Sequence, residues 1–253
     1  MSSKKISKKS EYDRIVAICQ PNFLPWLGYF EMIDRADIFV ALDDVQYVDR
    51  EWVNRNRIRR SGAPGGQWIT ASVKQGPRER MIREVMLFDE HKWRVKMIKS
   101  LEHAYQRSPF FKQYFTEIAS IITEESGTLV DLNLRLLRHL IRKLDIAGNL
   151  ILSSTLKIEG RRDRKLSKIC HCLGADLYLA NNGSRNYIDV NEFIDNDISF
   201  VFQNYQHPVY PQGRQEFVPN LSVIDLLFWH GPKSRDILLR GRPSDWRSEV
   251  QVA

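Results

Sequence analysis

The sequence has few cysteines and lacks any long apolar segment. Three of its 253 residues are cysteine, at positions 19, 170 and 172, and so few thiols are typical of a reducing compartment. No run approaches the roughly 20 apolar residues that are needed to cross a bilayer. The N-terminal MSSKKISKKS carries positive charge but no apolar core follows it, so it is not a secretory signal. We therefore expect a cytoplasmic protein without a membrane span.

A strong excess of one charge is also missing outside the first ten residues. The chain has 38 basic and 31 acidic residues, a formal net charge of +7. Four lysines lie in the first ten residues, which leaves +3 for the rest (7 − 4). We predict that residues 1–12 form a disordered basic tail, which is either simply solvated or touches nucleic acid or an anionic membrane. The body is too mildly charged to predict a specific nucleic-acid partner.

The Cys170-His171-Cys172 triplet has the residue types of a zinc site but not the full arrangement. A structural zinc site needs a second ligand pair at a matching spacing, and the sequence has no other cysteine pair. We interpret these cysteines as buried helix residues. No cofactor is indicated, although two adjacent carboxylates, Asp43 and Asp44, would suit Mg²⁺.

The hydrophobic pattern alternates between strands and helices, as in α/β proteins. The predicted strands are 15–19, 37–42, 67–73, 150–158, 176–180 and 198–202. The predicted helices are 27–36, 91–104, 109–122, 128–146, 159–175 and one from Ser222. Two strand–helix–strand units predict an α/β fold with a mostly parallel sheet, flanking helices and a helical insert.

We expect a single α/β domain over residues 13–235, with the insert at about 90–147 and a C-terminal extension at 236–253. The insert is interpreted as an αα-hairpin packed beside the sheet. Thr128 is the expected cap of its last helix and Gly148 the expected stop.

Polar side chains follow three of the predicted strands at the point where each strand ends. Gln20 and Asn22 follow the first strand, and Asp43, Asp44 and Gln46 follow the second. A third polar run, from Asn181 to Arg185, follows the strand at 176–180. In a parallel sheet these ends meet at one edge, where α/β proteins bind ligands. A shared binding site is therefore favoured over three unrelated turns and helix caps.

Two further segments have the residue types of a binding site. Gly160 and the arginines at 161 and 162 precede a predicted helix, where free amides and guanidinium groups hold anions. The alternative is a solvated basic face, which the helix dipole disfavours. The stretch 51–57 combines Trp52 with Asn54, Arg55 and Arg57. It suits sugars, bases or phosphates, or else forms an amphipathic surface held by salt bridges to nearby aspartates.

Candidate catalytic groups are few. His207 lies in a proline-rich loop near Tyr210, and a histidine held in this way is a better acid–base candidate than those on helices. Cys19 is either a nucleophile at a strand end or a buried core thiol, and we favour the core thiol. Because neighbouring strand residues point to opposite faces, only one of Asp43 and Asp44 is expected to face the site.

The first strand leads into P-x-x-G and a helix, which is similar to the phosphate-binding turn of nucleotidyltransferases with the HIGH-type fold. Those enzymes place histidines in this turn, where they stabilise charge on phosphate oxygens. This chain has Leu27-Gly28-Tyr29 instead. We therefore expect a Rossmann-like or HIGH-type sheet whose turn either only binds or supports a different chemistry.

Six segments in a fixed order carry a broader resemblance. They are QPNFLPWLGYFEMI, ADIFVALDDVQY, WVNRNRI, EGRRDRKLSKICHCLGADLYL, GSRNYID and QHPVYPQGRQEFVPNLSVIDLLFWHGP. Together they run from about Ile15 to Pro232, and the chain resembles the WbqC-like family. The sequence departs from the family's pattern at Ala180-Asn181-Asn182-Gly183 and at Trp229-His230, so His230 is not assigned a catalytic role.

The resemblance implies a bacterial protein that is encoded with O-antigen and other surface polysaccharide genes, which include those for lipopolysaccharide. It brings no settled catalytic residues. We predict a cytoplasmic enzyme, a transferase that modifies an amino or hydroxyl group of a nucleotide-activated sugar. The alternative is a non-catalytic ligand-binding or scaffold protein of a polysaccharide assembly complex, favoured by the absence of a standard nucleophile or metal motif.

In the enzyme hypothesis the ligand is a nucleotide-sugar or another phosphorylated small molecule, and the catalytic candidates are Asp43, Asp44 and His207. The predicted substrate-binding residues are Gln20, Asn22, Trp26, Gln46, Trp52, Asn54, Arg55, Arg57, Gly160, Arg161, Gly183, Ser184, Tyr187 and Tyr210.

Overall fold

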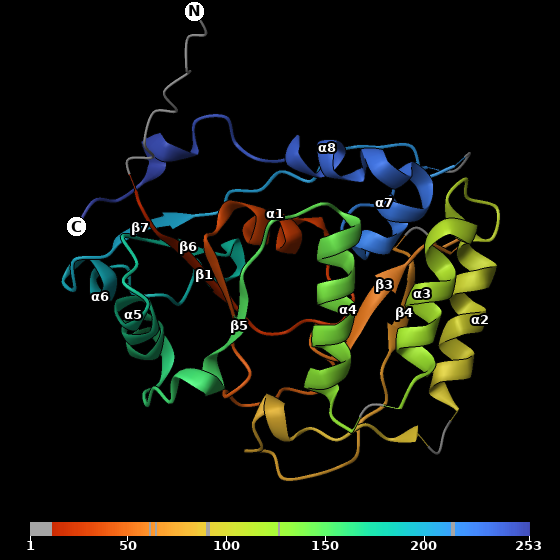
Figure 1. Cartoon of the computed structure of the whole chain (residues 1–253), viewed down its shortest axis with the longest axis horizontal. Coiled ribbons are helices and arrows are strands. Elements are labelled where there is room, and N and C mark those ends of the chain that lie inside the picture. The colour runs from red at the N-terminus through yellow and green to blue at the C-terminus, as the bar shows by residue number, and fades with distance from the viewer. Residues whose placement is uncertain (1–11, 61, 64, 90–91, 126, 214–215) are drawn as a thin grey trace, which may run out of the picture.

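The computed structural model describes residues 12–60, 62–63, 65–89, 92–125, 127–213 and 216–253. Most of the predicted basic tail lies outside these residues. The centre of the molecule is a sheet of five parallel strands in the order β5-β2-β1-β6-β7 (Figure 1). The strands are β1 Ile15–Cys19, β2 Ile38–Ala41, β5 Leu150–Leu152, β6 Leu177–Ala180 and β7 Ser199–Phe202. This sheet confirms the predicted α/β fold.

The strand order reverses in the middle of the sheet. From β1 the chain adds β2 and then β5 on one side, and it returns to the other side of β1 to form β6 and β7. β1 and β6 are therefore direct neighbours, with Ala17 opposite Leu179. Doubly wound sheets of this order bind ligands outside the carboxyl ends of their strands at this reversal point.

Both faces of the sheet are covered, because the strand residues alternate between two apolar clusters. Ile15 and Ala17 pack into the larger cluster, together with side chains of α1 (Leu27–Arg35), α4 (Leu129–Lys143) and α7 (Val223–His230). Val16 and Ile18 pack into the other cluster, against α5 (Arg162–Cys172) and α6 (Asn191–Ile194). This burial explains why the strands are apolar along their whole length.

The helical insert and a two-stranded hairpin form the other side of the molecule (Figure 1). Within the described residues the insert contains α2 (Trp93–Tyr105), α3 (Phe111–Thr123) and α4, which lie at the three helices predicted for this region. The insert therefore has one helix more than the αα-hairpin that we expected to pack beside the sheet. The hairpin pairs β3 (Arg55–Ile58) with β4 (Gln67–Thr70) in antiparallel register. Its second strand is shorter than the predicted 67–73.

The cap predicted for α4 is confirmed, and the stop is wrong. Thr128 precedes the helix, and its Oγ1 accepts a hydrogen bond from the Asp131 backbone N–H at 3.1 Å. The helix ends at Lys143, well before Gly148. The reason is Asp145, which adopts a left-handed conformation with φ of 54°, and short polar residues tolerate this conformation better than most.

The predicted strand 150–158 is also longer than the observed one. Only Leu150–Leu152 pair with β2, and the chain then turns into a 3₁₀ helix, η3 (Ser153–Leu156). Ser154 donates to the carboxylate of Asp43 from both its backbone N–H, at 3.0 Å, and its hydroxyl, at 2.7 Å. These bonds draw the chain out of the sheet toward the end of β2.

The C-terminal segment is attached to α1 through charged groups. After α8 (Ser234–Leu239), Arg242 donates to Glu31 at 2.6 Å and to Asp34 at 2.7 Å. Glu31 is fully buried and also accepts a bond from Arg35. Gln203, which follows β7, donates to the other oxygen of Glu31 at 2.6 Å. Burial makes each of these partners costly to remove.

Candidate functional site

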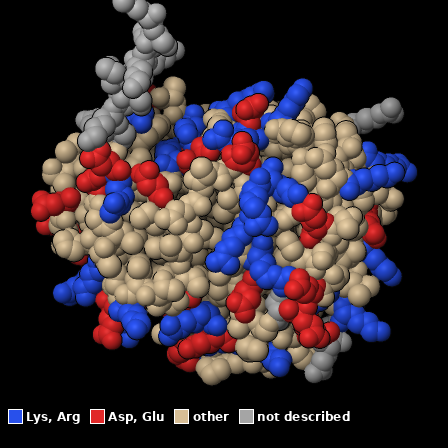
Figure 2. All heavy atoms as spheres, viewed as in Figure 1, with Lys and Arg blue, Asp and Glu red and all other residues tan. Residues whose placement is uncertain are grey.

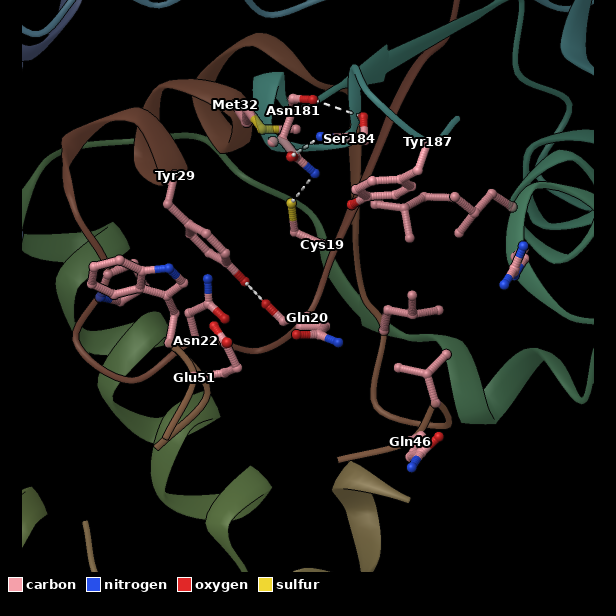
Figure 3. Close-up of a pocket in the computed structure, with 18 of the residues that line it drawn as sticks. Cys19, Gln20, Asn22, Tyr29, Met32, Gln46, Glu51, Asn181, Ser184 and Tyr187 are labelled. Carbon is pink, nitrogen blue, oxygen red and sulfur yellow. Dashed lines mark hydrogen bonds between the residues drawn. The ribbon is translucent and has the colours of Figure 1, made fainter. Parts of the chain in front are cut away.

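A cavity of about 1390 Å³ lies at the carboxyl ends of β1, β2 and β6, which is the reversal point of the sheet (Figure 3). Its volume is above the range that is usual for small-molecule sites. It brings together most of the residues that the sequence singled out. Those that line it are Gln20, Asn22, Trp26, Asp44, Gln46, Trp52, Arg57, Gly160, Arg161, Gly183, Ser184 and Tyr187.

The part of the cavity at the β1–β6 junction is formed by Cys19 and Asn181. The Asn181 side-chain amide lies 3.5 Å from the Cys19 sulfur, and its oxygen accepts a bond from the Ser184 backbone N–H at 3.1 Å (Figure 3). Burial raises the pKa of the Cys19 thiol to about 12. A thiol that stays protonated at neutral pH is a poor nucleophile, so this position supports the core-thiol interpretation.

Buried amide side chains fix the loop after β1 through hydrogen bonds to its backbone. Asn133 of α4 donates to the carbonyl oxygens of Pro21, at 2.6 Å, and Val53, at 2.8 Å. Asn56 donates to the carbonyl oxygens of Phe23 and Leu24. Prolines cannot donate backbone bonds, and these amides satisfy the loop's carbonyls in place of regular structure. The rigid loop leaves the side chains of Gln20 and Asn22 directed at the cavity.

The P-x-x-G turn has a packing explanation. A Cβ atom added at Gly28 would collide with the Trp26 ring, which lines the cavity. The Tyr29 hydroxyl then donates to the Gln20 carbonyl oxygen at 2.8 Å (Figure 3). The glycine thus allows the tryptophan to fold back over the start of α1.

The two adjacent aspartates differ in their surroundings. Asp43 is 2% exposed, accepts bonds from the two serines at the start of η3, and is not among the cavity-lining residues. Asp44 lines the cavity and forms an ion pair with Lys165 of α5, with Oδ1 and Nζ 2.8 Å apart. The Ser153 hydroxyl lies within hydrogen-bond distance of both Asp43 Oδ1 and the same Asp44 oxygen, and its single proton is shared between the two carboxylates. Of the two, only Asp44 lines the cavity, as expected. Both lie beyond the end of β2 at Ala41, so the reason is the bonding of Asp43 to Ser153 and Ser154 and not the alternation of strand residues.

The start of α5 forms a basic wall. Gly160 has φ of 149°, and a Cβ atom there would lie 3.2 Å from the Lys165 Cα, so glycine allows the close approach of the two segments. Arg161 and Arg162 line the cavity and are exposed. Within the described residues, neither guanidinium group has a hydrogen bond or an ion pair. Lys165 Nζ uses two of its three donors, on Asp44 Oδ1 and on the Asp44 carbonyl oxygen.

An aromatic pair lies on the other side of the cavity mouth. Trp52, 42% exposed, lines the cavity, and its ring centroid is 5.4 Å from that of Trp68, 44% exposed. The Arg55 guanidinium lies 4.2 Å from the Trp68 ring and the Arg57 guanidinium 5.8 Å. Arg57 lines the cavity while Arg55 does not. Exposed indoles beside arginines form a surface suited to flat or hydroxylated rings.

Three further predicted residues are placed away from the cavity lining. Asn54 is buried and donates to the Ala71 carbonyl oxygen. Tyr210 is buried and donates to Asp225 of α7 at 3.0 Å. His207 is not among the cavity-lining residues and stacks on Trp26 with ring centroids 6.1 Å apart. Burial lowers its pKa, so the neutral imidazole is favoured there.

Several groups that line the cavity were not chosen from the sequence. Lys165 is the most consequential, since its pairing with Asp44 joins α5 to the end of β2. The sequence could have indicated Lys165, because a lysine in the first turn of a helix that begins with arginines needs an acidic partner. The others include Tyr29, Glu51, Glu79 and Gln203.

The described part of the chain shows neither a metal-binding cluster nor a membrane-spanning helix. No group of three or more histidine, cysteine, aspartate or glutamate residues there is arranged to hold a metal ion. None of the helices described is both long and apolar enough to span a membrane.

The fold and the cavity define an α/β protein with a polar cavity at the reversal point of a doubly wound sheet. The chain belongs to the WbqC-like protein family, whose model matches residues 20–237. It is similar to the uncharacterized protein Rv1507c of Mycobacterium tuberculosis, with 34% identity over 226 residues that cover 88% of this chain and 96% of that one. No solved structure matches the chain.

Proposed function

We propose that the protein binds a nucleotide-activated sugar in this cavity and transfers a group to it, as a cytoplasmic enzyme of surface polysaccharide assembly. The observation that carries the proposal is the pair Arg161 and Arg162, two cavity-lining cations without an acidic partner in the described structure. They lie at a helix N-terminus, where the dipole repels cations. An anionic ligand removes this repulsion and also accepts bonds from the free helix amides.

The rest of the cavity matches the other parts of such a ligand. Amide side chains of Gln20, Asn22 and Asn181 lie where the strands end, and they can exchange hydrogen bonds with sugar hydroxyls. Trp52 and Tyr187 add exposed aromatic faces for a base or a sugar ring. The polysaccharide setting comes from the family, whose members are associated with O-antigen gene clusters.

Asp44 is the remaining acid–base candidate among the cavity-lining residues that the sequence singled out. Lys165 keeps its carboxylate in place through the 2.8 Å ion pair. In the proposed reaction Asp44 accepts the proton of the amino or hydroxyl group that is modified. Asp43 holds η3, and His207 supports Trp26; these are the positioning roles their contacts suit.

A non-catalytic ligand-binding function is the second candidate. Two observations favour it. The Cys19 thiol has a raised pKa, which makes it a poor nucleophile, and the Asp44 carboxylate is paired with Lys165, which makes it a weaker base. This function predicts the same ligands without turnover.

A thermal-shift screen tests the proposal. The protein without residues 1–11 is heated with free nucleotides and with UDP-, GDP- and dTDP-sugars, with and without Mg²⁺. A ligand at a hundredfold excess over its dissociation constant stabilises the folded state by about 2.7 kcal/mol. We expect at least one nucleotide-sugar to raise the midpoint, and turnover of that compound then separates the enzyme from the binding protein. No shift with any member would contradict the proposal.

A further inference from the structure

Glu51 is a carboxylate without a partner inside the cavity. It lines the cavity and is exposed, and its carboxylate has no hydrogen bond or ion pair to any described residue. It lies beside Asn22 and Gln20 (Figure 3), because the Phe23 backbone N–H donates to the Trp52 carbonyl oxygen at 2.9 Å and joins the two loops. The side chains of Asn22 and Gln20 are also without hydrogen-bond partners in the described structure. Three polar side chains without a partner among the described residues therefore lie near one another on this side of the cavity.

The basic groups of the cavity are engaged elsewhere or belong to its other end. Arg57 donates to the Gly65 carbonyl oxygen at 3.1 Å and lies toward Trp68. Lys165 is paired with Asp44. The segment that carries Asp44 continues to Gln46, which lies across the cavity from Glu51 in Figure 3. Arg161 and Arg162 belong to the same end as Lys165, because all three lie at the start of α5.

The α5 side of the cavity thus carries the unpaired cations Arg161 and Arg162, whereas Glu51 places an unpaired carboxylate beside Asn22. A second exposed carboxylate, Glu79, lines the cavity near Gln46. A ligand whose phosphates lie at α5 directs its sugar toward the strand ends and Glu51. We propose that Glu51 selects a nucleotide-sugar with a free amino group, so that the substrate class is a nucleotide-activated amino sugar. This inference rests on the proposed function and names the substrate of the same cavity.

The preference follows from charge. An ammonium group donates hydrogen bonds to the Glu51 carboxylate and neutralises it, whereas a hydroxyl group donates a bond but leaves the charge in place. An N-acetyl group is neutral and bulkier. Since Glu51 is exposed in the free protein, solvent screens the interaction, and we expect about fivefold discrimination and not more.

The test is a calorimetric titration with three matched probes: UDP-glucosamine, UDP-glucose and UDP-N-acetylglucosamine. The protein variants are the wild type, Glu51→Gln, and Glu102→Gln as a control. Glu102 is exposed on α2, outside the cavity lining, and its substitution removes the same charge. Glutamine has the shape of glutamate, so a folding defect is not expected in either variant.

We expect the wild type and the control to bind UDP-glucosamine about fivefold more tightly than UDP-glucose. Glu51→Gln should lose this preference while it retains UDP-glucose binding. Equal affinity of the wild type for the amine and the alcohol, or a preference that survives in Glu51→Gln, would overturn the inference and leave the proposed function intact. Failure of all three probes to bind would also overturn it, and the wider nucleotide-sugar screen then shows whether the proposed function fails with it.

Discussion

At the scale of single residues, the ion pair of Asp44 and Lys165 joins the end of β2 to α5 in the cavity lining. Both side chains are about nine-tenths buried, at 10% and 8% exposed. Asp44 has a second support in the Ser153 hydroxyl. A buried pair of this kind adds little net stability, but its removal from one side leaves an uncompensated charge.

Lys165→Met should therefore destabilise the fold by about 3–5 kcal/mol, because Asp44 stays buried without its cation. The double variant Asp44→Asn/Lys165→Met should recover much of this loss, since neither charge then remains. Urea unfolding of the two variants and the wild type measures the effect. If Lys165→Met were as stable as the wild type, water would already be solvating the Asp44 carboxylate, and the predicted cost of removing the lysine would be contradicted.

The residues of the site could be predicted from the sequence where their position followed from the end of a strand. Gln20, Asn22, Asp44 and Gln46 all line the cavity for this reason. The sequence could not distinguish asparagines that bond to the backbone inside the fold from asparagines that face the cavity. Asn54 was predicted to bind substrate, yet it bonds to the backbone of Ala71, and an amide side chain serves a loop carbonyl and a ligand equally well.

At the scale of elements, α7 carries a buried carboxyl group that links the fold to pH. Asp225 is fully buried and accepts a hydrogen bond from Tyr210. Burial raises its pKa from the ordinary 3.8 to about 6. The folded state therefore binds more protons than the unfolded state between these pH values. The stability this provides is present below pH 3.8 and is lost as the pH rises through about 6.

Asp225→Asn removes this dependence. A difference of roughly two pKa units corresponds to about 3 kcal/mol, so the variant should gain up to that amount relative to the wild type between pH 4 and pH 7. Unfolding free energies of both proteins at the two pH values give the comparison, in which other titrating groups cancel. Asp236→Asn, exposed on α8, is the control and should show no such change. A difference between Asp225→Asn and wild type that does not vary with pH would contradict the assignment.

Element boundaries were predictable where apolar periodicity set them and failed where side chains bonded to the backbone. The strand at 15–19 and the start of α4 follow directly from the pattern and the Thr128 cap. The early end of β5 depends on Asp43, more than a hundred residues away, which bonds to Ser153 and Ser154. No local pattern carries that information.

At the scale of the whole molecule, the alternation of strands and helices was enough to predict the α/β class and the convergence of strand ends. The order of the strands was not predictable, because it depends on the chain crossing back over β1 after the helical insert. That crossing places β6 beside β1 and thereby creates the reversal point where the cavity lies.

Two exposed arginines on α4 provide a matched control for the two arginines that line the cavity. Basic side chains run along the part of the surface where α4 lies (Figure 2), and Arg138 and Arg142 are exposed there. These two arginines lie outside the cavity lining, in contrast to Arg161 and Arg162. The same double substitution at each pair separates binding by the cavity from attraction by net charge.

The most direct test of the account is a calorimetric titration of a nucleotide-sugar that passes the thermal screen. The proteins compared are the wild type, Arg161→Gln/Arg162→Gln and Arg138→Gln/Arg142→Gln. Each bond to a charged group contributes about 1.5–3 kcal/mol, so loss of the α5 pair should weaken binding at least tenfold. The α4 variant should bind as the wild type does. Equal affinities for the wild type and the α5 variant would contradict the claim that this cavity holds the phosphates of the ligand.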